Sequence, residues 1–436
     1  MALIAYSLLD RLERGTSNED PLGFFTYATR LADEWLPGIT TRTRRARYYS
    51  MICGGLYLIE EGFKDLIRNS PNRDEETAKF FMRWERIWAA WNGAVDAAGT
   101  GMIGKNKISN LFDDDYFTVR NIDYPFIQRQ SDLGALGSYR TSLEAMGFLL
   151  ANSLELTFEG KILGELFWAQ AGNNRAWNQS IRVLDTRKFT FPCYRYRLAE
   201  YATRFGLDLR RDALSDANAK RLKEEKMLIR SKLLPCDGEG ARRYKVLEYV
   251  RHHGWGELDE YEILTRAGHR GRSLVRDTDL LERCAAAIIA LEEFRRATLD
   301  LLNLFRDHLY KEGRGDSPKA ILGEGPRKIT ARVNITHRNL LRFVRSAEFQ
   351  QVFRDFPMAD YRNGQDAIAW ITDLLEVHKD EMAKRRSPRW FIPAGGGKWT
   401  LDSSIVGQAD NDDVLAAYSY RTNNLLSMAR ETGCRI

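Results

Sequence analysis

The sequence predicts a mainly α-helical protein with several domains. Its 436 residues are enough for two or three domains with sizeable cores. Apolar residues recur at helical spacing through most of the chain, and stretches rich in glycine and proline separate the helical segments. From these breaks we expect four consecutive regions, at 1–109, 110–235, 236–325 and 326–436.

The first region is predicted to be an antiparallel helical domain. Its first helix spans 21–35. A second helix runs from about 42 to 69, with Thr41 as its N-cap and Pro71 after its end. The third spans 75–91 and carries a wide apolar stripe, which predicts that it is buried along much of its length.

The region 110–235 has a different pattern. A short helix from 136 ends at Gly147, residues 154–158 alternate like a strand, and a second helix follows with the phrase LTFEGKIL. This order resembles a winged helix-turn-helix domain, so we expect an embedded winged-helix-like α+β unit. The resemblance implies that the outer side of the recognition helix carries Ser138, Arg140, Thr141 and Glu144. A charged connector helix, 218–234, ends the region.

The C-terminal half again shows helical spacing. The longest apolar-periodic segment, 277–311, predicts a core helix, and glycines and prolines between 313 and 326 predict a linker. Further helices are expected at 336–356 and 365–385, and a last one from 413. No stretch reaches the ~18 uncharged residues of a membrane span, so we expect a cytoplasmic protein without a membrane partner.

The charge balance points to local clusters as the sites of any nucleic-acid binding. The chain has 66 basic and 60 acidic residues, a net charge of only +6. Arginine outnumbers lysine by 49 to 17. The guanidinium fork fits phosphate and carboxylate groups, although a GC-rich genome would produce the same bias.

The strongest cluster lies between 327 and 345, a segment without acidic residues. With Thr336 as N-cap, Arg338, Arg342 and Arg345 fall on one helical face. Lys328 and Arg332 precede them. Such a face could follow a nucleic-acid backbone or bind acidic protein surfaces, and the sequence leaves both interpretations open.

Two further clusters are candidates. One ends in two aromatic residues and consists of Lys379, Lys384, Arg385, Arg386, Arg389, Trp390 and Phe391. Cations beside aromatic rings are typical of sites that bind unpaired bases. The other lies at the predicted start of the helix 42–69. For its members we favour structural ion pairs, within this chain or with a partner: Arg42, Arg44, Arg45 and Arg47.

The sequence contains only weak matches to catalytic, nucleotide-binding or metal-binding motifs. The loop GTGMIG, 99–104, has the GxGxxG spacing but follows a helix rather than a strand, so we expect a plain loop. Glu159 and Lys161, with Asp132 upstream, form the minimal skeleton of a metal-dependent nuclease. The six histidines and five cysteines show no metal-ligand spacing or disulfide framework. We therefore predict no metal, no cofactor and no catalytic residue.

The segment LPGITTRTRRARYYS, 36–50, resembles a set of uncharacterised bacterial proteins that share the phrase PGxTxxTRRxRYY. Further matches to that set are FFMRWERIWAAW with the glycine loop after it, LTFEGKIL, and the segment from His378 to Phe391. This resemblance implies membership of multi-gene operons that act against phage, as a non-catalytic subunit beside an ATPase or nuclease.

The sequence thus predicts a subunit that binds DNA or RNA and scaffolds other protein subunits of the same operon. Two alternatives stay open. One is a metal-dependent nuclease centred on Glu159 and Lys161, and the other is a purely structural adaptor whose arginines bind protein carboxylates.

Overall fold

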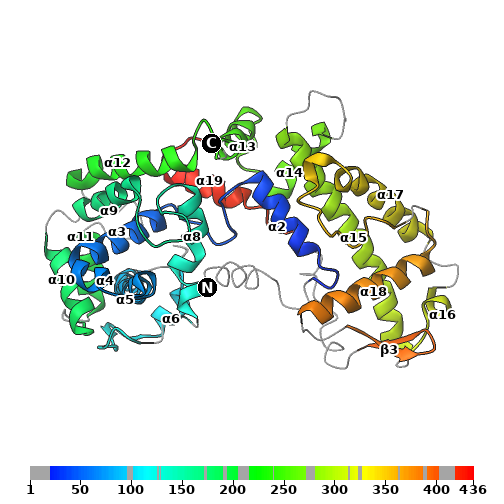
Figure 1. Cartoon of the computed structure of the whole chain (residues 1–436), viewed down its shortest axis with the longest axis horizontal. Coiled ribbons are helices and arrows are strands. Elements are labelled where there is room, and N and C mark those ends of the chain that lie inside the picture. The colour runs from blue at the N-terminus through cyan, green and yellow to red at the C-terminus, as the bar shows by residue number, and fades with distance from the viewer. Residues whose placement is uncertain are drawn as a thin grey trace. The chain divides into compact units, whose positions relative to one another are not determined.

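The computed structural model confirms a mainly helical protein (Figure 1). It describes residues 20–95, 102–124, 127, 129–170, 174–189, 194–204, 216–238, 240–271, 280–312, 315–322, 327–361, 364–385, 390–401 and 418–436. Strands in these ranges form two small two-stranded sheets. No helix in the described ranges combines the length and apolar character that crossing a membrane requires.

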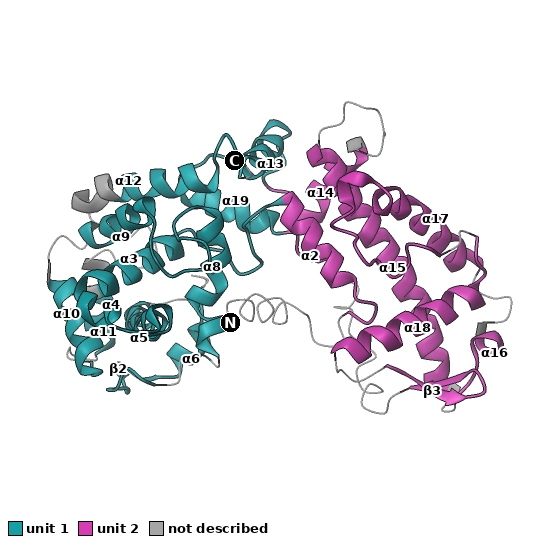
Figure 2. Cartoon of the chain, in the orientation of Figure 1, with its two compact units in different colours: residues 1–9, 36–256, 421–436 teal, residues 10–35, 257–420 magenta. Residues whose placement is uncertain are grey.

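The chain forms two compact units, each built from separated segments (Figure 2). Unit 1 comprises 1–9, 36–256 and 421–436, and unit 2 comprises 10–35 and 257–420. This division differs from the four consecutive regions expected. Within unit 1 the last helix returns to pack on helices near residue 240, and within unit 2 an early helix packs on the longest one. Hydrophobic periodicity shows that a face is buried but does not say against which segment.

Unit 1 is a helical body whose described residues include one short pair of strands. Its helices are α3 (Arg47–Gly62), α4 (Lys64–Arg68), α5 (Arg73–Ala94), α6 (Lys105–Ser109), α7 (Gln130–Leu133), α8 (Ala135–Ala145), α9 (Phe158–Gln170), α10 (Asn174–Thr186), α11 (Arg195–Arg204), α12 (Asp216–Leu233), α13 (Ala241–His252) and α19 (Thr422–Glu431). Strands β1 (Phe112–Asp113) and β2 (Tyr116–Phe117) pair antiparallel, with Phe112 opposite Phe117.

Helix α3 forms the centre of unit 1. It packs against α5, α8 and α9, and most of its residues are buried. Two glycines allow this close approach: a Cβ at Gly54 would lie 2.3 Å from the ring of Phe167, and one at Gly55 would lie 2.1 Å from the ring of Trp84. Any larger residue at either position would force these helices apart.

The segment expected to be a winged helix has two helices, α8 and α9, joined by a turn, and the strand expected at 154–158 is reduced to a single bridge at Leu156. Gly147, at φ 71°, follows α8, and a Leu149–Leu156 bridge closes the turn before α9. Ser138 is buried (4% exposed) because α8 packs on α3 and α7, so the prediction that it faces outward is wrong.

Unit 2 is built around α15, which has 33 residues and is about 50 Å long. Its helices are α2 (Phe24–Trp35), α14 (Glu260–Gly271), α15 (Leu280–Glu312), α16 (Pro318–Leu322), α17 (Arg327–Val344), the short 3₁₀ helix η1 (Ala347–Phe349) and α18 (Ala367–Arg385). Strands β3 (Phe391–Gly395) and β4 (Lys398–Leu401) form an antiparallel hairpin with an irregularity between Pro393 and Gly395. Helices α2, α14, α17 and α18 all pack on α15.

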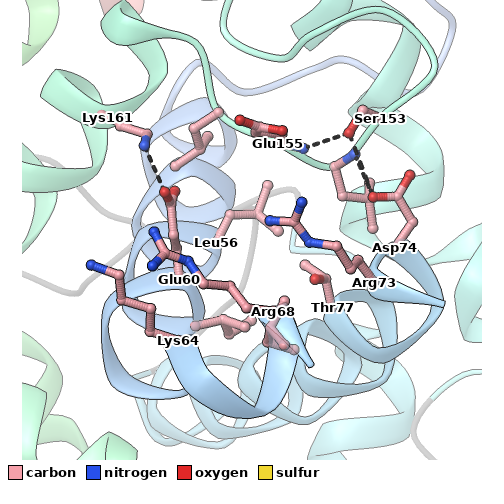
Figure 3. Close-up of a pocket in the computed structure, with 14 residues that line it drawn as sticks. Leu56, Glu60, Lys64, Arg68, Arg73, Asp74, Thr77, Ser153, Glu155 and Lys161 are labelled. Atoms are coloured by element: carbon pink, nitrogen blue, oxygen red, sulfur yellow. Dashed lines mark hydrogen bonds and ion pairs between the residues drawn. The ribbon is translucent and has the colours of Figure 1, made fainter. Parts of the chain in front are cut away.

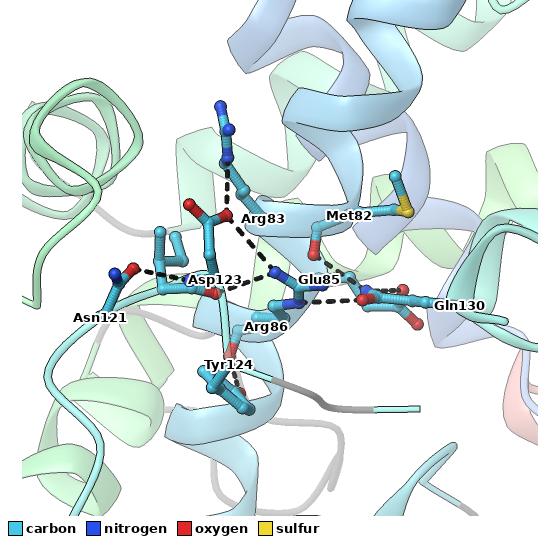
Figure 4. Close-up of polar contacts among 9 residues, drawn as sticks. Met82, Arg83, Glu85, Arg86, Asn121, Asp123, Tyr124 and Gln130 are labelled. Carbon is cyan, nitrogen blue, oxygen red and sulfur yellow. Dashed lines mark hydrogen bonds and ion pairs between the residues drawn. The ribbon is translucent and has the colours of Figure 1, made fainter. Parts of the chain in front are cut away.

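A buried carboxylate fixes α7 and α8 to α5 (Figure 4). Glu85 accepts hydrogen bonds from the side-chain amide of Gln130 (2.7 Å) and from the backbone N–H of Ala135 (2.6 Å). Gln130 in turn accepts a hydrogen bond from Arg86 Nε (2.9 Å). Desolvation raises the pKa of Glu85 to about 7, against the opposing effect of the two hydrogen bonds.

The raised pKa predicts a pH-dependent stability. Glu85 has a higher pKa folded than unfolded, so its contribution is complete below about pH 4.5 and is lost as the pH rises through about 7. At 1.36 kcal/mol per pKa unit the loss is about 3 kcal/mol. Between pH 5 and 8, urea unfolding should therefore show wild-type stability falling relative to that of Glu85→Gln, which cannot ionise. Parallel pH profiles of the two proteins would contradict this prediction.

Candidate nucleic-acid interface

Helix α17 begins at Arg327, nine residues before the predicted N-cap Thr336. Thr336 lies inside the helix, where its hydroxyl donates to the carbonyl oxygens of Arg332 (2.9 Å) and Val333 (3.1 Å). The expected helix 336–356 is thus wrong at both ends. Lys328 and Arg332 consequently join the same helical face as the three arginines predicted to form it.

The opposite face of α17 is anchored in the core of unit 2. Its buried residues are Thr330, Val333, Thr336, His337, Leu340, Leu341 and Phe343, and the helix packs on α15. The ring of His337 lies 5.2 Å from that of Phe294 and 5.0 Å from that of Trp370. Its Nε2 lies 3.0 Å from the carbonyl oxygen of Met358. This packing fixes the rotation of the helix and therefore the direction of its other face.

The exposed face of α17 carries a row of cations, which we call the basic stripe and define as Lys328, Arg332, Arg338, Arg342 and Arg345. Helical hydrogen bonding continues to Arg345, whose backbone N–H donates to Leu341 (3.1 Å). Ile335, 57% exposed, lies within the stripe.

The members of the basic stripe differ in their partners. Arg332 forms an ion pair with Asp300 of α15. Arg345 Nη2 donates only a long hydrogen bond, 3.4 Å, to the carbonyl oxygen of Ala359. Within the described ranges, Lys328, Arg338 and Arg342 have no carboxylate partner. Their charges are therefore available to an external anion.

A hollow of about 470 Å³ adjoins the C-terminal end of the stripe. Arg345 lines it together with Arg354, Gln350 and Gln351, and Asp355 and Asp360 add negative charge. Amide side chains can hydrogen-bond to base edges, so this hollow extends the candidate interface. No sequence pattern predicts this hollow, because the segment was expected to continue the helix.

In the predicted cluster around Trp390, the aromatic pair is buried and cannot stack on bases. Trp390 is buried (2% exposed), and its backbone N–H donates to Nε2 of His378 (2.9 Å). The Arg385 side chain is only 7% exposed, and it forms ion pairs with Asp20 (2.8 Å) and Glu381 (2.6 Å). The prediction is wrong for these two residues because β3 and α18 pack together. Arg386 and Arg389 lie outside the described residues.

The arginines near residue 45 make contacts inside unit 1. Only Arg47 lies in α3; the others precede it, because Thr40 and Thr43 hydrogen-bond to one another and hold the chain in a turn. The ion pairs are Arg47 with Glu225 and Arg45 with Glu431. The remaining two donate to backbone carbonyl oxygens, Arg42 to Asp132 (3.3 Å) and Arg44 to Thr41 (3.4 Å).

The outer side of α8 has little net positive charge with which to bind nucleic acid. Arg140 is paired with Glu144 at 3.0 Å, which leaves Thr141 as the exposed polar residue of the proposed recognition helix.

The residues of the nuclease hypothesis are engaged elsewhere. Glu159, in the first turn of α9, pairs with Lys232 (2.8 Å), whose hydrogen bond lowers the pKa of the carboxyl. Lys161 pairs with Glu60 (2.6 Å). Across the described ranges, no group of three or more His, Cys, Asp or Glu side chains is placed to hold a metal ion. The geometry therefore gives no support to metal-dependent cleavage.

The glycine motif lies partly outside the described residues, which exclude 99–101. Gly104 has a left-handed backbone (φ 73°), and the preceding element is the helix α5 rather than a strand. Among the residues described before this loop, the chain forms a helix and not the strand that a phosphate-binding loop of this kind requires.

Substitution of a buried, paired arginine should lower the free energy of unfolding far more than substitution of an exposed arginine. Arg47→Met leaves the Glu225 carboxylate buried without its cation, which should lower the free energy of unfolding by about 3–5 kcal/mol. Arg338→Met removes an exposed side chain and should change it by less than ~0.5 kcal/mol. Urea unfolding of both variants measures the difference, and Arg47→Met with Glu225→Gln should recover part of the loss. Equal stabilities of the two single variants would refute the distinction.

Comparison with known proteins gives no match to this chain. No protein-family model matches it, and neither a curated protein nor a solved structure matches it. The function is therefore inferred from the exposed side chains and their charges.

Proposed function

We propose that this protein binds the phosphate backbone of nucleic acid through the basic stripe of α17. The observation that carries the proposal is a row of exposed cations on a helix whose other face is locked into a core. Three of them, Lys328, Arg338 and Arg342, have no carboxylate partner in the described ranges.

The dimensions and chemistry of the stripe suit a polyanion. Seventeen residue steps separate Lys328 from Arg345, about 25 Å along the helix axis. Guanidinium groups bind phosphate oxygens through two parallel hydrogen bonds, and each phosphate neutralised releases counterions. The contacts are with the backbone, so the stripe alone gives affinity without sequence preference.

The wider role is part of the same proposal. We infer a non-catalytic, scaffolding subunit that holds nucleic acid for other subunits, such as an ATPase or nuclease, in an anti-phage complex of the cytoplasm. The sequence resemblance to proteins of such operons supports this context. A winged-helix role for α8 to α9 rests on the order of its elements alone, and the binding proposal does not need it.

The first test is a salt series. Four phosphate contacts predict a slope of log K against log salt of roughly −3.6 for duplex DNA. The variant Arg338→Glu/Arg342→Glu/Arg345→Glu should bind far more weakly and reduce the slope by roughly 2.7. The matched control changes three exposed arginines of unit 1 by the same charge, Arg44→Glu/Arg182→Glu/Arg230→Glu, and should keep the wild-type slope.

Duplex DNA, single-stranded DNA and RNA are compared in parallel by fluorescence anisotropy. No binding of any of them at ~50 mM salt would overturn the proposal and favour the adaptor, whose arginines bind protein carboxylates. An equal loss in the control variant would show that only net charge matters, and would also overturn the role of the stripe.

A second test increases the charge of the stripe. Asp300 neutralises Arg332, so Asp300→Asn should free this arginine and remove an anion from the surface. Affinity for nucleic acid should rise several-fold and the salt slope should steepen by roughly 0.9. Unchanged or weaker binding, with an unchanged melting temperature, would place Arg332 outside the interface.

A further inference from the structure

A pocket of about 300 Å³ opens in unit 1, in the size range of small-molecule sites (Figure 3). It lies where the end of α3, the helix α4 and the start of α5 meet the turn before α9. Its apolar lining consists of Leu56, Ile59, Ile67, Leu154 and Leu156. This pocket is independent of the basic stripe, which belongs to unit 2.

Four cations line the same pocket: Lys64, Arg68, Arg73 and Lys161. Figure 3 shows the Arg73 side chain reaching into the pocket, with the Arg68 guanidinium beside Glu60. Lys161 is paired with Glu60 (2.6 Å). Among the residues that the structure describes, Lys64 and the two arginines have no ion-pair partner.

Three carboxylates, Glu60, Asp74 and Glu155, also line the pocket, so its four cations leave a net charge of +1. Asp74 accepts hydrogen bonds from the Leu154 N–H (3.3 Å) and the Ser153 hydroxyl (3.5 Å), both in the turn before α9. Glu155 is exposed on this turn and forms no ion pair with the pocket cations. The hydroxyl of Thr77 adds a neutral donor.

We propose that this pocket binds a phosphate monoester with a small apolar or aromatic body. Arg68 and Arg73 would hold the phosphate, Lys64 would balance its second charge, and the leucines and isoleucines would cover the apolar body. A phosphate monoester carries −1.5 to −2 at neutral pH, so it would compensate the net positive charge of the lining. Its acceptor oxygens suit the two guanidinium groups that have no ion-pair partner within the described part of the chain. Because inorganic phosphate has no apolar group to contact the leucines and isoleucines, we expect the pocket to bind it more weakly than a phosphate monoester.

The test is calorimetric titration of the full chain with phenyl phosphate, inorganic phosphate and benzoate. Phenyl phosphate should bind at least tenfold more tightly than either comparison ligand. Arg68→Met/Arg73→Met should weaken it at least tenfold, whereas Arg182→Met/Arg230→Met, two exposed arginines of unit 1 outside the pocket, should not. Glu60→Gln, which frees Lys161, should strengthen binding.

The same group occurs at the 5′ end of nucleic acid, so a 5′-phosphorylated trinucleotide is compared with its 5′-hydroxyl form. Preference for the phosphorylated form, lost in Arg68→Met/Arg73→Met, supports the site and assigns it to a nucleic-acid end. Binding of phenyl phosphate alone supports it and assigns a small molecule. The proposal is overturned if phenyl phosphate fails to bind at millimolar concentration, or if the arginine variant, folded by circular dichroism, binds as the wild type does. The basic stripe stays intact throughout, so these outcomes do not bear on it.

Discussion

The packing of α17 on α15 is the constraint on which the candidate interface depends. Seven residues of α17 are buried on one side, among them His337 between the rings of Phe294 and Trp370. A helix held this way cannot rotate, because any turn would expose apolar surface and remove cations from water. The direction of the basic stripe therefore follows from the core of unit 2 rather than from the cations themselves.

The same chain uses arginine for the opposite purpose in its interior. Arg243 is buried and donates to three backbone carbonyl oxygens, those of Leu233 (2.7 Å), Lys232 (3.0 Å) and Pro37 (2.5 Å). Arg295 is paired with Glu292 at 2.9 Å, and both side chains are buried. A guanidinium taken from water needs such partners to offset its desolvation. An abundance of arginine is thus partly explained by structure, and only the exposed, unpartnered members are evidence for an external anion.

Contacts between distant segments hold each unit together. In unit 2, Asp20 accepts hydrogen bonds from the hydroxyl of Tyr418 (2.9 Å) and from Arg385 (2.8 Å), close to the N-terminus of α2. His378 bridges the chain near residue 21 and Trp390: the Trp390 N–H donates to Nε2, so Nδ1 carries the proton donated to Pro21. These polar links replace water for groups that the helices bury, and they connect segments separated by hundreds of residues.

The sequence by itself determined that the chain is mainly helical, that a core helix lies within the predicted segment 277–311, observed as α15, and that Arg338, Arg342 and Arg345 share one face. These depend on local spacing, which periodicity records. Tertiary structure decided the start of α17, the burial of Trp390 and Ser138, the pairing of Arg47 and Arg385, and the two discontinuous units. Local pattern cannot supply these, because whether a cation meets water or a carboxylate depends on which distant segment packs over it.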